Sequence, residues 1–157
     1  MKDNLLKRNW NGDGKCCICA QNKTVQHMFF ECTMARYIWS LVAMVVGVDC
    51  GPVSWESFWI WVEMFMPRVV KFHMVGLAGT CWAIWRARNN ICFEQKFVRS
   101  HTEIVRLASS LISFWAELQT EEEGKALEEG SEALKSAALH FHPRSPSDGS
   151  AGTVLLQ

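Results

Sequence analysis

Residues 16–32 read CCICAQNKTVQHMFFEC, and this stretch decides how the rest of the chain is organised. Within it, three cysteines and one histidine follow the spacing C-x2-C-x7-H-x4-C: Cys16, Cys19, His27 and Cys32. Three thiolates and one imidazole are a complete ligand set for a tetrahedral zinc ion. A C-x2-C pair presents two thiolates from a single turn, and the second pair completes the set. Because four protein ligands leave no open position for water, the pattern predicts a closed, structural Zn2+ site.

A simpler explanation of these residues is that the thiols are buried apolar side chains at a chance spacing. A four-member pattern arises by accident far less often than a lone C-x2-C pair, which favours the metal. Cys17 lies between two of the proposed ligands and is left as a spare thiol, since an i, i+2 pair reaches one ion less readily than an i, i+3 pair. Cys50, Cys81 and Cys92 are expected to be small apolar fillers.

The composition indicates a single-domain chain that is rich in apolar residues. Of its 157 residues, 49% are hydrophobic, and the 8 Trp and 9 Phe imply substantial burial or a partner surface. Residues 1–106 carry 13 Lys and Arg against 8 Asp and Glu, whereas residues 107–157 carry 3 against 8. A basic body followed by an acidic tail is a mild indication of a polyanionic partner.

The cysteine count and the start of the chain bear on location. Seven cysteines are an odd number, and the polar residues 1–4 do not open a secretory leader. We therefore expect an intracellular protein, nuclear or cytoplasmic and not secreted, whose thiols bind metal or lie buried. The longest uncharged apolar runs, residues 37–48 and 72–85, are shorter than the about 18 residues of a membrane span, so no membrane partner is expected.

Hydrophobic periodicity predicts a mainly α fold, with the small Cys3His zinc module followed by about four helices and a disordered C-terminal tail. The first helix is expected to begin with Thr33 as its N-cap and to end at Gly47. The second is capped by Ser54 and stopped by Pro67. The sequence QNK at residues 21–23 marks a turn between the two halves of the metal loop.

The second half of the chain continues the helical pattern. A third helix is expected over about residues 69–94, and a fourth opens with a capping box at Ser100 and Glu103. After Gln119 this helix is expected to extend, solvated, to about Ala138. The predicted division is therefore a zinc-binding module with its following helix at 1–48, a Trp-rich helical region at 49–119, and an acidic then disordered tail at 120–157.

Two blocks of this sequence resemble one known family. The first block comprises NLLKRNW at residues 4–10, the CCIC of residues 16–19, HMFFEC at residues 27–32, and Ala35-x3-Trp39; the second is WAIWRARNNICF at residues 82–93. Together they are similar to the zinc-binding domain of plant non-LTR (LINE-type) retrotransposon reverse transcriptases and to the segment that commonly follows it. The chain departs from the family at Lys23, where Glu is usual, and at Met28, where Leu is usual.

The resemblance implies a non-catalytic zinc-binding domain derived from such a reverse transcriptase and truncated at its N-terminal side. The chain has no Tyr-x-Asp-Asp sequence to hold catalytic magnesium, and its aspartates are scattered. Cys32 and His27 mimic a thiol–imidazole pair, but no orienting acid is evident and zinc ligation explains both residues more simply. We therefore expect no catalytic residue and no enzyme activity.

Two functions of different class follow from this site. The first is weak binding of RNA or DNA, with Lys15, Lys23 and Arg36 facing phosphate and with Trp10 and Tyr37 stacking on bases. The second is a zinc-stapled helical protein-interaction module without nucleic-acid binding.

The Trp-rich helices are the docking face of that second function. Exposed indoles of Trp59, Trp61, Trp82 and Trp85 would drive self-association. On the last of these helices, Arg86 and Arg88 are expected to be solvated, with Arg88 paired to Glu94 or to backbone carbonyls at the helix end.

Overall fold

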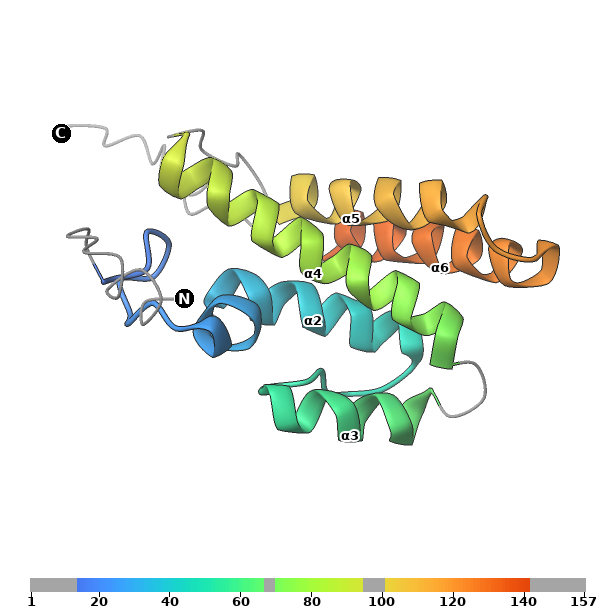
Figure 1. Cartoon of the computed structure of the whole chain (residues 1–157), viewed down its shortest axis with the longest axis horizontal. Helices are drawn as coiled ribbons and strands as arrows, with labels where there is room; N and C mark the ends of the chain where they lie inside the picture. Colours follow the sequence, from blue (N-terminus) through green and yellow to red (C-terminus); the bar gives the residue numbers. More distant parts are fainter. Residues whose placement is uncertain (1–13, 67–69, 95–100, 142–157) are drawn as a thin grey trace, which may run out of the picture.

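The computed structural model describes residues 14–66, 70–94 and 101–141, and its regular structure is almost entirely helical (Figure 1). A π-helical turn, η1, is followed by five α-helices, with bounds η1 (His27–Glu31), α2 (Thr33–Val46), α3 (Trp55–Phe65), α4 (Val70–Phe93), α5 (His101–Ala116) and α6 (Glu121–His140). Within the described ranges, extended pairing is limited to one antiparallel bridge between Lys15 and Asn22. The predicted mainly α fold is confirmed, whereas its division into three regions stays a prediction.

The boundaries of α2 follow from its two end residues. Cys32, with extended backbone at φ −59° and ψ 139°, is the N-cap, and Thr33 is already the first helical residue. The prediction of Thr33 as N-cap is therefore wrong by one position, because the extended Cys32 already sets the start of the helix. At the other end Gly47 has a φ of 81°, a left-handed conformation that glycine adopts without strain, so the helix ends there as predicted.

Ser54 caps α3 as predicted. The backbone amide of Ser57 donates to Oγ of Ser54 over 3.1 Å, and the amide of Ser54 donates to Oγ of Ser57 over 2.8 Å. This reciprocal capping box satisfies two backbone donors that a helix start leaves without intrahelical partners. Pro67 and Ser100, which were expected to stop this helix and to cap α5, lie outside the described residues.

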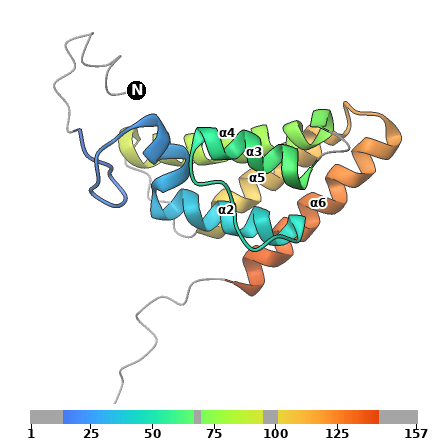
Figure 2. The ribbon, with the colours of Figure 1, turned by 90° about the horizontal axis from the view of Figure 1, so that it is seen from below.

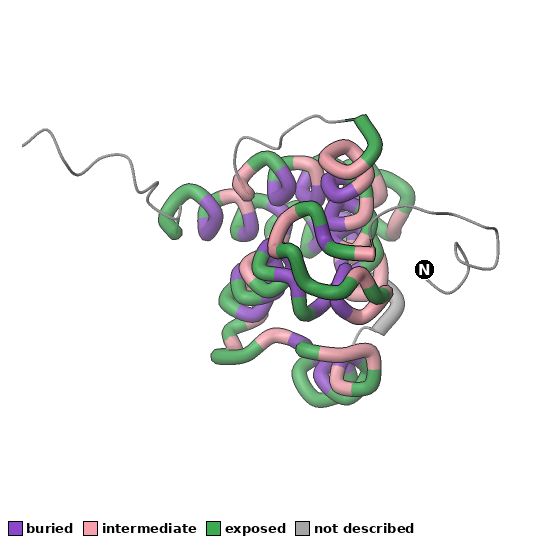
Figure 3. Tube along the Cα trace, turned by 90° about the vertical axis from the view of Figure 1, so that its left-hand side faces the viewer, coloured by how far each residue is buried: buried purple, intermediate pink, exposed green. Residues whose placement is uncertain are grey.

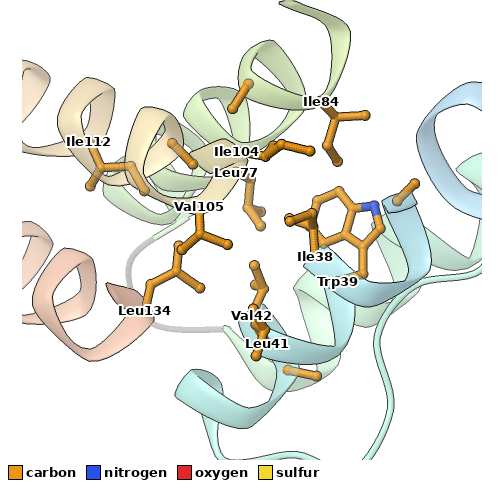
Figure 4. Close-up of a cluster of buried hydrophobic side chains, with 14 of the residues drawn as sticks. Ile38, Trp39, Leu41, Val42, Leu77, Ile84, Ile104, Val105, Ile112 and Leu134 are labelled. Atoms are coloured by element: carbon orange, nitrogen blue, oxygen red, sulfur yellow. The ribbon is translucent and has the colours of Figure 1, made fainter. Parts of the chain in front are cut away.

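The hydrophobic core lies between α2, α4, α5 and α6 (Figure 4). Trp39 of α2 is 1% exposed and lies near Ile84 of α4, and the burial of such a side chain stabilises the fold by roughly 1.5–3 kcal/mol. Figure 3 shows that the buried positions follow the inward-facing side of each helix. The labelled core residues are Ile38, Trp39, Leu41, Val42, Leu77, Ile84, Ile104, Val105, Ile112 and Leu134.

Helices α5 and α6 form an antiparallel pair (Figure 1). The predicted solvated extension of one helix to Ala138 is wrong, because the chain turns after Ala116 and α6 returns along α5. A Cβ at Gly124 would lie 2.7 Å from the carbonyl oxygen of Ala116, so this close turn needs a glycine. Ser109 and Ser131 each donate a hydroxyl hydrogen bond to the carbonyl of the other, over 3.3 and 3.1 Å. The glutamates of α6 lie on the side that faces away from α5, where they are exposed or half-exposed.

Helix α3 contacts the rest of the chain through aromatic rings. The ring of Phe58 lies 5.8 Å from that of Trp39, centroid to centroid. Trp61 is 5% exposed, so the expectation that it is an exposed indole is wrong, whereas Trp59 is 53% and Trp82 46% exposed. In the described part of the chain, no helix is both long and apolar enough to cross a membrane.

Candidate metal centre

Residues 14–26 form a tight loop that places two cysteines on one turn. The amide of Cys16 donates to the carbonyl of Gln21 over 2.7 Å, and the amide of Ala20 donates back to the carbonyl of Cys16 over 2.9 Å. Ala20 has a φ of 58°, the left-handed conformation that reverses the chain after Cys19. The thiols of Cys16 and Cys19 therefore point to the same side, as the C-x2-C spacing predicts.

His27 is positioned by the short element η1. The hydroxyl of Thr24 accepts a hydrogen bond of 2.9 Å from the His27 amide, which fixes the start of the turn. The imidazole is 2% exposed; its Nε2 lies 3.1 Å from Sγ of Cys19, while its Nδ1 lies 3.7 Å from Oε2 of Glu31. A carboxylate near the second ring nitrogen is one of the arrangements found behind metal-bound histidines, where a hydrogen bond from that nitrogen orients the ring.

The structure brings the four predicted ligand atoms together. The sulfurs of Cys16, Cys19 and Cys32 and a nitrogen of His27 all lie within 4.8 Å of one another. Sγ of Cys32 is 3.9 Å from each of the other two sulfurs. Zinc–sulfur bonds of about 2.3 Å give a tetrahedral edge of about 3.8 Å, so these separations fit one tetrahedral ion. Three of the four residues are buried and Cys19 is half-buried.

The electrostatic environment differs between the two buried thiols. Burial alone acts to raise the pKa of Cys16, but hydrogen bonds from the backbone amides of Ile18 and Cys19, with help from His27 and Arg88, bring that pKa down to about 6. Burial raises the pKa of Cys32 to about 11, because the neighbouring sulfurs add to the effect and offset the backbone hydrogen bond at Met34. Because metal ligation requires thiolates, a cation at this centre would displace the Cys32 proton.

Arg88 of α4 lies against this centre, contrary to the expectation that it is solvated. Its side chain is 2% exposed, and Nη2 donates a hydrogen bond of 3.4 Å to Sγ of Cys16. Among the described residues, no ion pair joins Arg88 to Glu94, its expected partner. The sequence signal for this contact is the 82–93 block, which contains Arg88 and resembles the same family as the cysteine block.

The remaining cysteines also differ from expectation. Cys17 and Cys92 form a disulfide, so Cys17 is not a spare thiol and Cys92 is not an apolar filler. The bond joins the metal loop to the end of α4 and removes the one extra thiol that lies between the proposed ligands. Cys50 is exposed, so it is no filler either. Only Cys81 behaves as expected, since burial raises its pKa to about 11.

The predicted nucleic-acid contacts are spread over several environments. Lys15 and Arg36 are exposed. Lys23 is half-buried, with Nζ 5.4 Å from the ring centroid of Phe93. The hydroxyl of Tyr37 donates to the carbonyl of Phe141 over 3.0 Å, and its ring lies edge-on to another ring 5.1 Å away, so one side of Tyr37 is already occupied. Trp10 lies outside the described residues, and nucleic-acid contact by this set stays a prediction.

One family model matches this chain. Residues 1–39 match the family described as zinc-binding in reverse transcriptase. The match ends at Trp39 and includes all four residues of the cluster, so it covers about a quarter of the 157 residues. No curated protein and no solved structure matches. The family match to residues 1–39 and the Cys3His cluster within them both fit a zinc-binding domain of a reverse transcriptase.

Proposed function

We propose that this reverse transcriptase zinc-binding domain, residues 1–39, holds one Zn2+ ion as a structural staple through Cys16, Cys19, His27 and Cys32. The observation that carries the proposal is the separation of the sulfurs, which is close to the edge of a zinc tetrahedron. Four protein ligands fill a tetrahedral ion, so no position is left for a reactive water. The ion would hold the loop, η1 and the start of α2 together.

Metal analysis of the purified chain tests this proposal. We expect one zinc per chain by native mass spectrometry, and a loss of helical signal in circular dichroism when a chelator removes it. The variant Cys32→Ser should lose the metal, whereas Cys50→Ser, which changes an exposed thiol away from the centre, should keep it. A chain that carries no zinc, and whose helicity does not respond to the chelator, would overturn the proposal.

A binding role is favoured over catalysis. Within the described residues, the Cys3His centre is the one group of three or more His, Cys, Asp or Glu side chains that could hold a metal ion. The family match covers a zinc-binding domain and no polymerase. The combination of the 4–39 and 82–93 blocks supports an origin in a plant non-LTR retrotransposon, from which the chain retains a non-catalytic part.

Weak binding of RNA or DNA is the activity that we propose for this module. Lys15 and Lys23 lie on the two paired segments of the metal loop, because the amide of Lys23 donates to the carbonyl of Gly14 over 2.8 Å. Zinc would hold the backbone of these two segments in place, and Arg36 adds an exposed basic side chain on α2. For binding through phosphates, the logarithm of the association constant falls linearly with the logarithm of the salt concentration.

A filter-binding titration with single-stranded RNA and DNA at low salt tests the nucleic-acid proposal. We expect binding that needs zinc and that weakens in Lys15→Ala and Lys23→Ala by a similar amount for every sequence tested. Lys125→Ala, an exposed lysine on α6, is the matched control. No binding at low salt by the zinc-loaded chain would remove this function.

A zinc-stapled protein-interaction module is the second candidate. The observation in its favour is the outer side of α3, where Trp59, Ile60 and Met64 are each more than half exposed. Contiguous exposed apolar side chains of this kind often mark protein contacts. Sedimentation of wild type and Trp59→Ser over a range of concentrations tests it, and a monomer at all concentrations would count against self-association.

A further inference from the structure

A buried guanidinium beside a metal centre needs an explanation. Arg88 is 2% exposed, and arginine is almost never fully buried unless its charge is compensated. Among the described residues, its Nη1 has no hydrogen-bond partner, and its Nη2 donates to Sγ of Cys16. No carboxylate of the described chain forms an ion pair with it. Its charge therefore faces the sulfur cluster.

The charge of a loaded centre supplies the missing compensation. Three thiolates and a neutral imidazole around Zn2+ leave one net negative charge. A buried net charge is costly unless an opposite charge lies beside it. Arg88 carries one positive charge, and its Nη2 donates a hydrogen bond to Sγ of Cys16. Hydrogen bonds to a metal-bound sulfur from outside the ligand set typically change metal affinity by 10–100-fold when they are lost.

We infer that Arg88 is the charge-compensating positioning residue of the zinc centre, so that the metal-binding unit consists of residues 14–32 together with the C-terminal half of α4. This inference rests on the proposed zinc site. It extends that site well beyond the matched residues 1–39, onto a helix about fifty positions later in the chain.

Two further contacts hold the same half of α4 against the metal loop. Cys92 lies one helical turn after Arg88, on the same face, and is bonded to Cys17, the neighbour of Cys16. The ring of the next residue, Phe93, lies under the ammonium group of Lys23. Figures 1 and 2 both place the blue metal loop at the C-terminal end of α4. Adjacent residues of the loop thus meet successive turns of one helix.

Substitutions that separate charge from packing test the inference. In the full chain, Arg88→Met keeps the length of the side chain without its charge, and Arg88→Lys keeps the charge. Charge compensation predicts a zinc dissociation constant about 10–100-fold higher for Arg88→Met, with partial rescue in Arg88→Lys. A packing role predicts the opposite order, because methionine suits an apolar environment better than lysine does. Arg86→Met, an exposed neighbour on the same helix, should bind zinc as wild type does.

Chelator competition gives the dissociation constants, and the sulfur-to-cobalt charge-transfer band of the Co2+-loaded chain reports the sulfur environment directly. We expect this band to shift in Arg88→Met and to keep its position in Arg86→Met. Equal zinc affinity of wild type and Arg88→Met, or an affinity of Arg88→Met at or above that of Arg88→Lys, overturns the inference and leaves the zinc site standing. A wild-type chain without zinc overturns both.

Hydrogen exchange on the wild-type chain provides a measurement that does not depend on the folding of any variant. Zinc should slow amide exchange in residues 84–93 of α4 together with residues 16–32, and slow it more there than in residues 121–130 of α6, which lie at the other end of the molecule (Figure 1). If zinc protects the loop but leaves residues 84–93 no more protected than residues 121–130, α4 is not part of the metal-binding unit.

Discussion

The indole Nε1–H of Trp39 donates a hydrogen bond of 2.7 Å to the carbonyl oxygen of Phe29. That carbonyl belongs to η1, the short turn that carries His27, while Trp39 lies two turns into α2. The bond fixes the turn onto the helix, and the stacked rings of Phe30 and Trp39, 5.9 Å apart, close the same junction. A tryptophan seven positions after Cys32, the last of the four proposed ligands, is therefore part of what supports His27.

Trp39→Phe should destabilise the chain by about 2–4 kcal/mol, because it leaves the Phe29 carbonyl without its donor and leaves unfilled volume in the core. Urea unfolding monitored by circular dichroism measures the change. Trp59→Phe, at an exposed indole, is the matched control and should stay within about 0.5 kcal/mol of wild type. Equal losses in the two variants would contradict a special role for the Trp39 hydrogen bond.

The metal cluster could be predicted from the sequence because all its ligands lie within seventeen positions, where backbone turns alone decide which side chains meet. Arg88 and Cys92 could not, since they approach the loop only through the packing of α4 in the folded chain. A charged residue near the end of a helix is solvated in most proteins, so the local sequence predicts an exposed Arg88, whereas the structure buries it.

The predicted solvated extension differs from the observed helix α6 because the packing of α6 on α5 depends on the fold and not on local composition. Its glutamates outnumber its large apolar residues, so composition indicated a solvated extension. The buried stripe is narrow and consists mostly of small residues, which pack closely on α5 without raising the local hydropathy: Gly124, Leu127, Ser131, Leu134, Ala137 and Ala138. The Gly124 contact that reverses the chain can be recognised only once both helices are in place.

The two glycines of α6 should respond to alanine with opposite signs. At Gly130 an added Cβ meets nothing within 4 Å, so Gly130→Ala should stabilise the chain by about 0.5–1 kcal/mol through its effect on the unfolded state. At Gly124 the same Cβ would lie 2.7 Å from a backbone oxygen of Ala116, so Gly124→Ala should cost about 1–3 kcal/mol. Thermal unfolding of both variants measures the pair. Stabilisation by both would show that α6 does not make the close turn onto α5.

Cys50 and Cys81 should differ strongly in reactivity. Cys50 is exposed, whereas burial raises the pKa of Cys81 to about 11, so at pH 8 only about one Cys81 side chain in a thousand is a thiolate, the form that reacts. Iodoacetamide followed by peptide mass spectrometry should label Cys50 first. Labelling of Cys81 should accelerate about tenfold for each pH unit up to about pH 11 as the thiolate fraction grows. Equal rates for the two thiols at pH 8 would contradict the packing of Cys81 in α4.

Loss of the Cys17–Cys92 disulfide should lower stability without removing the metal. The bond closes a loop with a sequence separation of 75, for which chain entropy gives an upper estimate of about 4.5 kcal/mol. Cys17→Ser removes the bond and leaves the four proposed ligands intact, so its zinc content should equal that of wild type while its urea midpoint falls. Cys92→Ser also removes the bond but frees Cys17 beside the centre, where the extra thiol competes with Cys16 for the ion.

Comparison of the two serine variants separates the tether from the ligand set. If the disulfide acts only as a tether, reductant-treated wild type and Cys17→Ser should have the same urea midpoint. Cys92→Ser should match them in stability but show a broader sulfur-to-cobalt band, since two sulfur sets share the ion. A loss of zinc from Cys17→Ser would instead make Cys17 a ligand and contradict the assignment of Cys16.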